Sequence, residues 1–325
     1  MKKKVILYRT LPEAELARLR DAFDVVEFPE LKNANQDDFL AELSSADGLI
    51  GAGLPLGAQQ LDRATQLKAI STISVGTDAF DLDYLSARSI PVMHTPTVLT
   101  ETTADTIFTL ILCTARRAIE LDRFVRQGEW HQSIGVDQFG SNVHGKTLGI
   151  LGLGRIGTAV ARRGHHGFGM NIQYYNTSRK EQAEQELGAK KVSFDELIET
   201  SDFICSVLPY TEQTDKLFNK DAFNKMKSSA FFINGGRGKT VDEAALIDAL
   251  KKGVIKGAGL DVYEKEPLPI SSELIGLDNV VLFPHVGSAT HETRYAMAQC
   301  AVDNLINALE GNVEQNCANI RQLKQ

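Results

Sequence analysis

Short apolar runs of β-forming residues alternate with helical stretches from one end of the chain to the other. Before residue 100, the pattern predicts a helix over residues 12–23 and strands over residues 5–8, 25–28, 48–51, 69–74 and 91–94. From Lys146 onward, it predicts strands over residues 147–151, 172–175, 203–208, 231–234, 258–262 and 280–283. Strands that alternate with helices are typical of parallel sheets covered by helices on both faces. The pattern therefore predicts an α/β fold built from two strand series.

A long helical stretch separates the two strand series and marks the first domain boundary. Residues 100–127 are predicted to form this helix, because threonines near its start suit a helix N-terminus and Gly128 suits its end. Residues 128–142 contain three glycines, one tryptophan and one phenylalanine without a clear period. We expect an extended loop there, and long loops in compact domains are often functional or lie between subunits.

Composition places the chain among ordinary globular proteins and excludes fibres, peptide hormones and disordered tails. The 325 residues are 43% hydrophobic and 24% charged, which is enough chain for two domains. The net charge of -7 comes from 42 acidic and 35 basic residues spread along the whole length. Because no basic stripe could follow a phosphate backbone, nucleic acid is not an expected partner.

Neither the apolar runs nor the cysteines point to a membrane, a secretory route or a metal. The longest uncharged apolar stretch, residues 106–115, is too short to span a bilayer, so we expect a buried helix. The basic start of the chain is followed by only four apolar residues, too few for a signal peptide, which favours the cytoplasm. The four cysteines form no Cys-x-x-Cys pair, so we expect reduced core thiols, no disulfide and no metal site.

The sharpest local motif joins the first strand of the second series to the helix after it. This strand runs into Gly152-x-Gly154-x-x-Gly157, with Arg155 and Ile156 between the last two glycines. Gly152 permits a tight turn, Gly154 lets the backbone approach a pyrophosphate, and Gly157 lets helix and strand pack closely. The helix N-terminus adds unpaired N–H groups for the anion. The motif predicts a dinucleotide-binding Rossmann unit; the alternative is a glycine-rich turn without a ligand.

The end of the next strand bears on the choice between the two nicotinamide cofactors. An acidic residue there would accept hydrogen bonds from the adenosine ribose of NAD, but this chain has neutral Asn176, followed by Ser178 and Arg179. Without a carboxylate to repel it, a 2′-phosphate could contact Arg179 through a charge-assisted hydrogen bond. This favours NADPH, with NADH as a weaker alternative. The competing interpretation is that Arg179 and Lys180 only open a solvated helix.

Three chemically complementary residues each follow a predicted strand: Arg237, Glu266 and His285. In an open parallel sheet the ligand crevice lies outside the carboxyl ends of the strands, so these residues can converge. An arginine can clamp a carboxylate, a histidine can donate a proton near neutral pH, and a carboxylate beside it can keep the imidazole protonated. Taken singly, each has a simpler interpretation, as a capping cation, a surface charge and a core histidine.

Together these motifs resemble the D-isomer-specific 2-hydroxyacid dehydrogenase family, and the resemblance covers essentially the whole chain. The matching elements are Gly152-x-Gly154-x-x-Gly157, Asn234-x-x-Arg237-Gly238, Gly259-x-Asp261-Val262 with Glu266-Pro267, and Pro284-His285-x-Gly287. Residues 71–76, 93–101 and 285–295 resemble the bacterial glyoxylate/hydroxypyruvate reductases within that family.

The resemblance implies two doubly wound parallel-sheet domains. A central Rossmann NAD(P)-binding domain would span residues 100–286, and a discontinuous flavodoxin-like substrate-binding domain would combine residues 1–99 and 287–325. The active site would lie in the cleft between the domains. A homodimer would form through the long helix and the 128–142 loop.

The resemblance also implies roles for individual residues. Arg237, Glu266 and His285 would be catalytic. The cofactor would contact Gly152, Gly154, Arg155, Ile156, Gly157, Asn176, Ser178, Arg179 and Asp261. The substrate would contact Leu54, Val75, Gly76, Arg237 and Ser288, with Arg294 a further candidate near its distal end. The remaining histidines are expected to be structural or exposed.

The implied activity is the reduction of small 2-oxo acids, glyoxylate and hydroxypyruvate first and 2-keto-D-gluconate as a further candidate. Other family activities, such as 3-phosphoglycerate or D-lactate dehydrogenase, remain alternatives. The former is less favoured because many of its members carry an added regulatory domain. Formate dehydrogenase is disfavoured because its pattern pairs the histidine with Gln instead of Glu266. A non-catalytic dinucleotide-sensing protein is an alternative from a different class.

Overall fold

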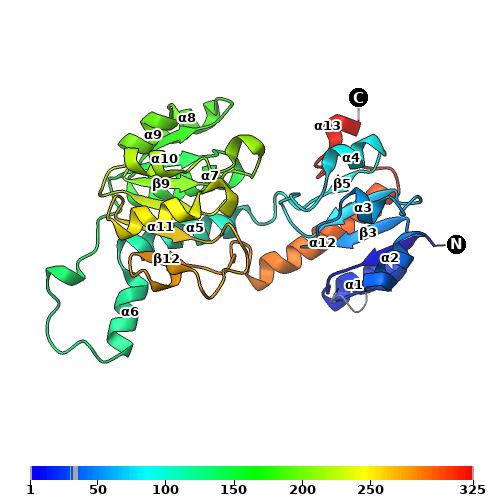
Figure 1. The fold of residues 1–325 in the computed structure, drawn as a ribbon. Helices are drawn as coiled ribbons and strands as arrows, with labels where there is room; N and C mark the ends of the chain where they lie inside the picture. Colours follow the sequence, from blue (N-terminus) through cyan, green and yellow to red (C-terminus); the bar gives the residue numbers. More distant parts are fainter. Residues whose placement is uncertain (1, 30, 32–35, 324–325) are drawn as a thin grey trace. The chain divides into compact units, whose positions relative to one another are not determined.

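The computed structural model describes residues 2–29, 31 and 36–323. The chain divides into two compact units (Figure 1). One unit combines Met1–Leu99 with Ala289–Gln325, and the other comprises Thr100–Ser288. In the described part of the chain, no helix is both long enough and apolar enough to cross a membrane.

The first unit is built on a five-stranded, all-parallel sheet with the order β2-β1-β3-β4-β5. Its strands are β1 (Lys4–Leu7), β2 (Asp24–Glu27), β3 (Gly48–Gly51), β4 (Ala69–Thr72) and β5 (Val92–Met93). Its helices are α1 (Glu13–Ala22), α2 (Gln36–Leu43), α3 (Ala58–Leu61), α4 (Leu82–Ala87), α12 (His291–Leu309) and α13 (Ile320–Leu323). Because side chains alternate along a strand, Val5 and Leu7 pack with α1 and α12, whereas Ile6 faces a core that includes Phe39 of α2.

The second unit is built on a seven-stranded, all-parallel sheet with the order β12-β11-β10-β9-β6-β7-β8. Its strands are β6 (Thr147–Leu151), β7 (Asn171–Tyr175), β8 (Lys190–Lys191), β9 (Phe203–Ser206), β10 (Phe231–Asn234), β11 (Gly257–Leu260) and β12 (Val280–Leu282). The strand order reverses beside β6, which is where open α/β sheets form their ligand crevice. The predicted α/β class with two parallel sheets is confirmed.

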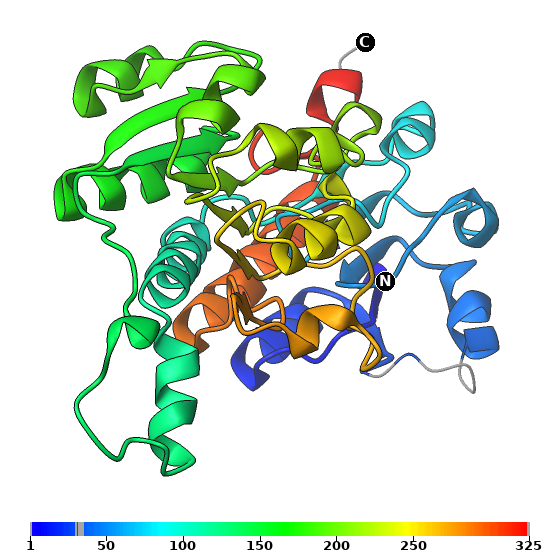
Figure 2. The same cartoon turned by 60° about the vertical axis from the view of Figure 1, so that its left-hand side comes forward.

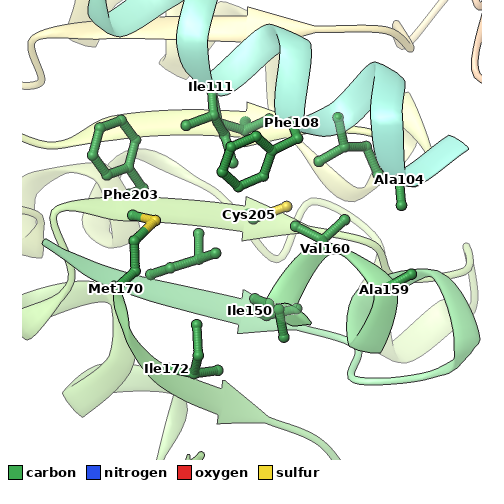
Figure 3. Close-up of a cluster of buried hydrophobic side chains, with 14 of the residues drawn as sticks. Ala104, Phe108, Ile111, Ile150, Ala159, Val160, Met170, Ile172, Phe203 and Cys205 are labelled. Carbon is green, nitrogen blue, oxygen red and sulfur yellow. The ribbon is translucent and has the colours of Figure 1, made fainter. Parts of the chain in front are cut away.

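Helices cover both faces of this sheet. Its α-helices are α5 (Thr100–Ala115), α6 (Ala118–Arg126), α7 (Arg155–Arg162), α8 (Glu181–Leu187), α9 (Phe194–Thr200), α10 (Lys220–Lys225) and α11 (Glu243–Lys251). On one face, Phe108 and Ile111 of α5 and Val160 of α7 pack over Ile150 and Cys205 of the central strands (Figure 3). On the other face, α9, α10 and α11 cover the alternate side chains of the same strands. The predicted buried helix over residues 106–115 is confirmed as part of α5.

Short irregular turns complete the second unit. A π-helical turn, Arg163–Gly167, follows α7. The 3-10 turns are Val136–Gln138, Glu212–Thr214, Gly238–Thr240 and Glu273–Gly276. Residues 128–142 form a loop apart from the first of these 3-10 turns, as predicted.

The single helix predicted over residues 100–127 is wrong, because the structure breaks it between Ala115 and Ala118. The carbonyl of Ala115, which would accept a bond from residue 119 in a continuous helix, accepts one from Ser141 N at 2.7 Å. Arg117 then takes a left-handed backbone conformation, with φ 54°. The redirected helix α6 and the loop after it project away from the sheet of their own unit (Figures 1 and 2).

The four cysteines are all free. Cys205 and Cys317 are buried, as expected of core thiols, whereas Cys113 and Cys300 are only partly buried. Burial raises the pKa of Cys205 to about 12, so its thiol stays protonated.

Candidate active site

Arg237, Glu266 and His285 lie beyond the carboxyl ends of three neighbouring strands of the second unit. Arg237 follows β10, Glu266 lies in the loop after β11, and His285 follows β12. Since these strands are adjacent and parallel, their ends share one edge of the sheet. The three residues are therefore brought together by topology although up to 48 positions separate them along the chain (285 − 237).

His285 and Glu266 are in direct contact. The Nδ1 atom of His285 lies 2.6 Å from Oε2 of Glu266, and Glu266 Oε1 accepts a 3.0 Å hydrogen bond from Tyr263 N. The side chain of His285 is 52% exposed, so a small molecule can reach the ring. Because Nδ1 faces the carboxylate, Nε2 is the ring nitrogen available to a substrate.

The contact changes the proton affinity of both groups. The hydrogen bond with Glu266 raises the pKa of His285 above its ordinary value, although burial acts in the opposite direction. Burial alone would raise the pKa of Glu266, but the hydrogen bonds from His285 and Tyr263 lower it below its ordinary value. An ionised carboxylate beside a protonated imidazole is therefore the favoured state of this pair.

The loop that carries Arg237 is fixed by hydrogen bonds to its backbone. The Arg237 carbonyl accepts bonds from Thr240 Oγ1 at 2.7 Å and from buried Asn234 Nδ2 at 3.1 Å, and Asn234 Oδ1 accepts one from Gly236 N. The positive charge of Arg237 helps to lower the pKa of Glu266 and partly opposes the rise in the pKa of His285. Its guanidinium therefore lies close enough to act electrostatically on both partners.

Asp261 supports the backbone around His285. Its buried carboxylate accepts hydrogen bonds from Val286 N at 2.7 Å and from Gly287 N at 2.9 Å. His285 itself has φ 56°, a left-handed conformation that a histidine rarely adopts without support. Burial raises the pKa of Asp261, with the two N–H bonds opposing that effect. The sequence predicts only a cofactor contact for Asp261 and carries no signal of this backbone contact.

The glycine motif connects β6 to α7 with a geometry that fits a dinucleotide. Gly152 has φ 92°, which favours glycine, and a Cβ on Gly157 would lie 2.2 Å from the Gly152 carbonyl oxygen. A Cβ on Gly154, by contrast, would point into open space. Gly154 also precedes the first turn of α7, where Arg155 and Ile156 present backbone N–H groups. This open cradle at a helix N-terminus suits a pyrophosphate.

The segment after β7 places Asn176, Ser178 and Arg179 between the strand and α8. Asn176 Nδ2 donates to the carbonyl and to the hydroxyl of Ser178, at 3.1 and 3.2 Å. The exposed Arg179 forms an ion pair with Glu184 of α8, with Nη2 2.7 Å from Oε2. The guanidinium thus lies at the start of a solvated helix, as the simpler interpretation expects, and beside the predicted ribose site.

The other predicted substrate residues are divided between the two units. Leu54 follows β3, and Val75 and Gly76 follow β4, so these three belong to the first unit. Arg294 also belongs to the first unit, on α12, whereas Ser288 ends the second unit.

His94 has a structural role, as expected of the remaining histidines: it supports the predicted substrate loop of the first unit. Its Nδ1 lies 2.9 Å from the Val75 carbonyl, and Ser74 Oγ donates to the Gly76 carbonyl at 2.7 Å. A lone histidine after a strand carries no local signal of such a contact, because the 19 positions between His94 and Val75 are bridged only in the fold.

Among the described residues, no cluster of three or more His, Cys, Asp or Glu side chains could hold a metal ion.

Known proteins resemble the chain over almost all of its length. A family model described as "D-isomer specific 2-hydroxyacid dehydrogenase, NAD binding domain" matches residues 108–287. A "Glyoxylate/hydroxypyruvate reductase B" from Escherichia fergusonii is 53% identical over 319 residues, covering 98% of each chain. One of the same name from Serratia proteamaculans is 52% identical over 325 residues, covering 100% of each chain.

Solved structures agree with the sequence relatives. A crystal structure of a protein from Thermus thermophilus has a TM-score of 0.88 at 39% identity, covering 97% of this chain and 99% of that one. An NADPH-dependent glyoxylate/hydroxypyruvate reductase from Sinorhizobium meliloti, solved with NADP and malonate, has a TM-score of 0.87 at 33% identity, covering 98% of each chain. Motifs, fold and relatives together show that this chain belongs to the D-isomer specific 2-hydroxyacid dehydrogenase family and that it uses a nicotinamide dinucleotide cofactor.

Proposed function

We propose that the chain is an NADPH-preferring reductase of small 2-oxo acids. Glyoxylate and hydroxypyruvate are its first substrates, and 2-keto-D-gluconate is a further one. The observation that carries the proposal is the 2.6 Å contact between His285 Nδ1 and Glu266 Oε2, at strand ends next to the Arg237 loop. The names of the relatives at 52–53% identity support the choice of substrates.

In the reaction, the three residues have different roles. Arg237 binds the substrate carboxylate and polarises the neighbouring carbonyl. His285 donates a proton from Nε2 to the carbonyl oxygen, and Glu266 keeps the imidazole protonated and oriented through Nδ1. The bound nicotinamide supplies the hydride that the carbonyl carbon receives. The product is a 2-hydroxy acid, of D configuration where a stereocentre forms.

The cofactor contacts are assigned to the glycine cradle and to the segment after β7. Gly152, Gly154, Arg155, Ile156 and Gly157 would hold the pyrophosphate. Asn176, Ser178 and Arg179 would surround a 2′-phosphate, since no carboxylate occupies position 176. The NADP-bound neighbour from Sinorhizobium meliloti supports this preference, and NADH is expected to bind more weakly. Asp261 is also assigned to the cofactor.

The remaining assignments concern the substrate and the assembly. The first unit would serve as substrate-binding domain, with Leu54 and the backbone of Val75 and Gly76 holding the substrate carboxylate. Ser288 and Arg294 would face the distal end of the substrate.

We also propose a homodimer formed through α6 and the loop after it. These elements expose Trp130, Ile134 and Val136, which are 61%, 52% and 75% accessible.

A substrate and cofactor panel tests the proposal. Glyoxylate, hydroxypyruvate, 2-keto-D-gluconate, pyruvate and 3-phosphohydroxypyruvate would be assayed with NADPH and with NADH, following the loss of nicotinamide absorbance. We expect the highest kcat/KM for the first two acids with NADPH. In His285→Asn, turnover should fall by about 10²- to 10⁴-fold while NADPH affinity is retained. The absence of turnover with every acid would instead favour the dinucleotide-sensing alternative.

A further inference from the structure

Tyr174, on β7, connects the cofactor-specificity segment to the helix after it. The residue is fully buried, and its hydroxyl donates a 2.6 Å hydrogen bond to Glu184 Oε1. The same hydroxyl accepts a 2.9 Å bond from the backbone N–H of Lys180. One buried oxygen therefore fixes both the main chain next to Arg179 and the carboxylate that Arg179 contacts.

Glu184 in turn holds the guanidinium of Arg179 through hydrogen bonds. Its Oε2 accepts from Arg179 Nε at 2.8 Å and from Nη2 at 2.7 Å, while Oε1 is held by Tyr174. Two of the five N–H groups of the arginine are thereby used, and three remain for a ligand. The hydrogen bonds from Arg179 and Tyr174 lower the pKa of Glu184, so the carboxylate is ionised at neutral pH.

A contribution to folding does not account for the ion pair between Arg179 and Glu184. The Arg179 side chain is 68% exposed, and an ion pair in that position contributes little to stability. What the contacts do achieve is to restrict a long, flexible side chain to one orientation before a ligand arrives. Such pre-organisation lowers the conformational entropy lost on binding.

We propose that Tyr174 and Glu184 are positioning residues that hold Arg179 where it reads the 2′-phosphate of NADPH. The inference rests on the proposed NADPH preference and deepens it. It requires that the orienting effect of Glu184 outweigh the repulsion between its carboxylate and the phosphate. Removing either positioning residue should therefore weaken ligands that carry the phosphate and leave other ligands unaffected.

The test uses two fragments that report on the adenosine end alone, 2′,5′-ADP and 5′-AMP, with binding measured calorimetrically on the full chain. In Tyr174→Phe the ring is kept and only the hydroxyl is lost. We expect the Kd for 2′,5′-ADP to rise about fivefold or more, with the Kd for 5′-AMP unchanged. The matched control is Tyr175→Phe, which removes a hydroxyl from the adjacent, partly buried position of the same strand. It should leave both constants unchanged.

Glu184→Ala separates orientation from charge. If orientation dominates, 2′,5′-ADP binds about fivefold more weakly, whereas tighter binding would mean that Glu184 merely competes with the phosphate and would overturn the inference. Glu181→Ala removes a negative charge from the first turn of the same helix but keeps the hydrogen bonds between Arg179 and Glu184, and it serves as the control. A general folding defect would weaken both fragments together and would also overturn the inference.

The outcome for the wild-type chain distinguishes the two proposals. If it binds 2′,5′-ADP no more tightly than 5′-AMP, the NADPH preference itself is wrong. If it prefers 2′,5′-ADP and both Tyr174→Phe and Glu184→Ala keep that preference in full, the cofactor proposal stands and the positioning role is wrong.

Discussion

At the residue scale, the candidate site depends on how His285 is held as well as on what it contacts. The backbone of His285 is left-handed, with φ 56°, and the N–H groups of the next two residues donate hydrogen bonds to the carboxylate of Asp261. The left-handed conformation costs free energy, and a buried carboxylate with two hydrogen bonds offsets that cost. Asp261 therefore fixes the imidazole from the backbone side, and Glu266 fixes it from Nδ1.

The pH dependence of reduction should follow the His285–Glu266 pair. Reduction requires a protonated imidazole, so the rate falls as pH rises through the pKa of His285, which Glu266 raises. In Glu266→Gln the anionic partner is lost and the pKa falls, so the loss of rate should begin at lower pH. The measurement is kcat/KM for the preferred 2-oxo acid across the neutral range for both proteins. An unshifted profile would show that Glu266 does not tune His285.

At the element scale, the site exists because loops after adjacent strands pack tightly together. Gly238 follows Arg237 in the loop after β10, and a Cβ there would lie 1.8 Å from the carbonyl carbon and oxygen of Tyr263, after β11. Tyr263 in turn donates from its hydroxyl to the Phe283 carbonyl at the end of β12, at 2.8 Å. The loops that carry the three residues thus pack against one another, through the close backbone approach of Gly238 to Tyr263 and through the hydrogen bond from the Tyr263 hydroxyl.

Gly238→Ala should therefore disturb both stability and activity. The overlap is with backbone, which cannot rotate away, so we expect a loss of about 2 kcal/mol or more in the free energy of unfolding. Gly276→Ala is the control, because a Cβ at that position meets nothing within 4 Å. Its effect should stay within about 0.5 kcal/mol. Denaturant unfolding measures the free energy of unfolding of both variants. Equal stabilities for the two would contradict the packing argument.

At the scale of the whole molecule, the proposed homodimer makes the exposed apolar surface of α6 and the 128–142 loop an interface. Val136 is 75% exposed, and Val136→Asp should place a charge in that interface and shift the protein toward monomers. Ile270→Asp is the control, since Ile270 is 92% exposed and lies outside this segment. Light scattering coupled to size-exclusion chromatography gives the mass of each. A wild-type monomer, or a dimeric Val136→Asp variant, would contradict the proposal.

The sequence by itself determined every described strand except the short β8 (Lys190–Lys191), together with the glycine turn and the three residues that follow β10, β11 and β12. These features are local: apolar period identifies a strand, and glycine spacing identifies a turn that only glycine fits. The general rule that parallel strands share a ligand edge then placed Arg237, Glu266 and His285 together without coordinates.

Only the tertiary structure decided where the helix after residue 100 breaks, how Asp261 holds His285, and how Tyr174 reaches Glu184. Each depends on a contact between residues of different elements, from 10 to 26 positions apart along the chain. The helix breaks because Ser141 takes the carbonyl of Ala115, and Asp261 meets backbone groups 25 and 26 positions away. The spacing of residues along the chain does not predict such contacts, because these contacts form only when separate elements pack against one another.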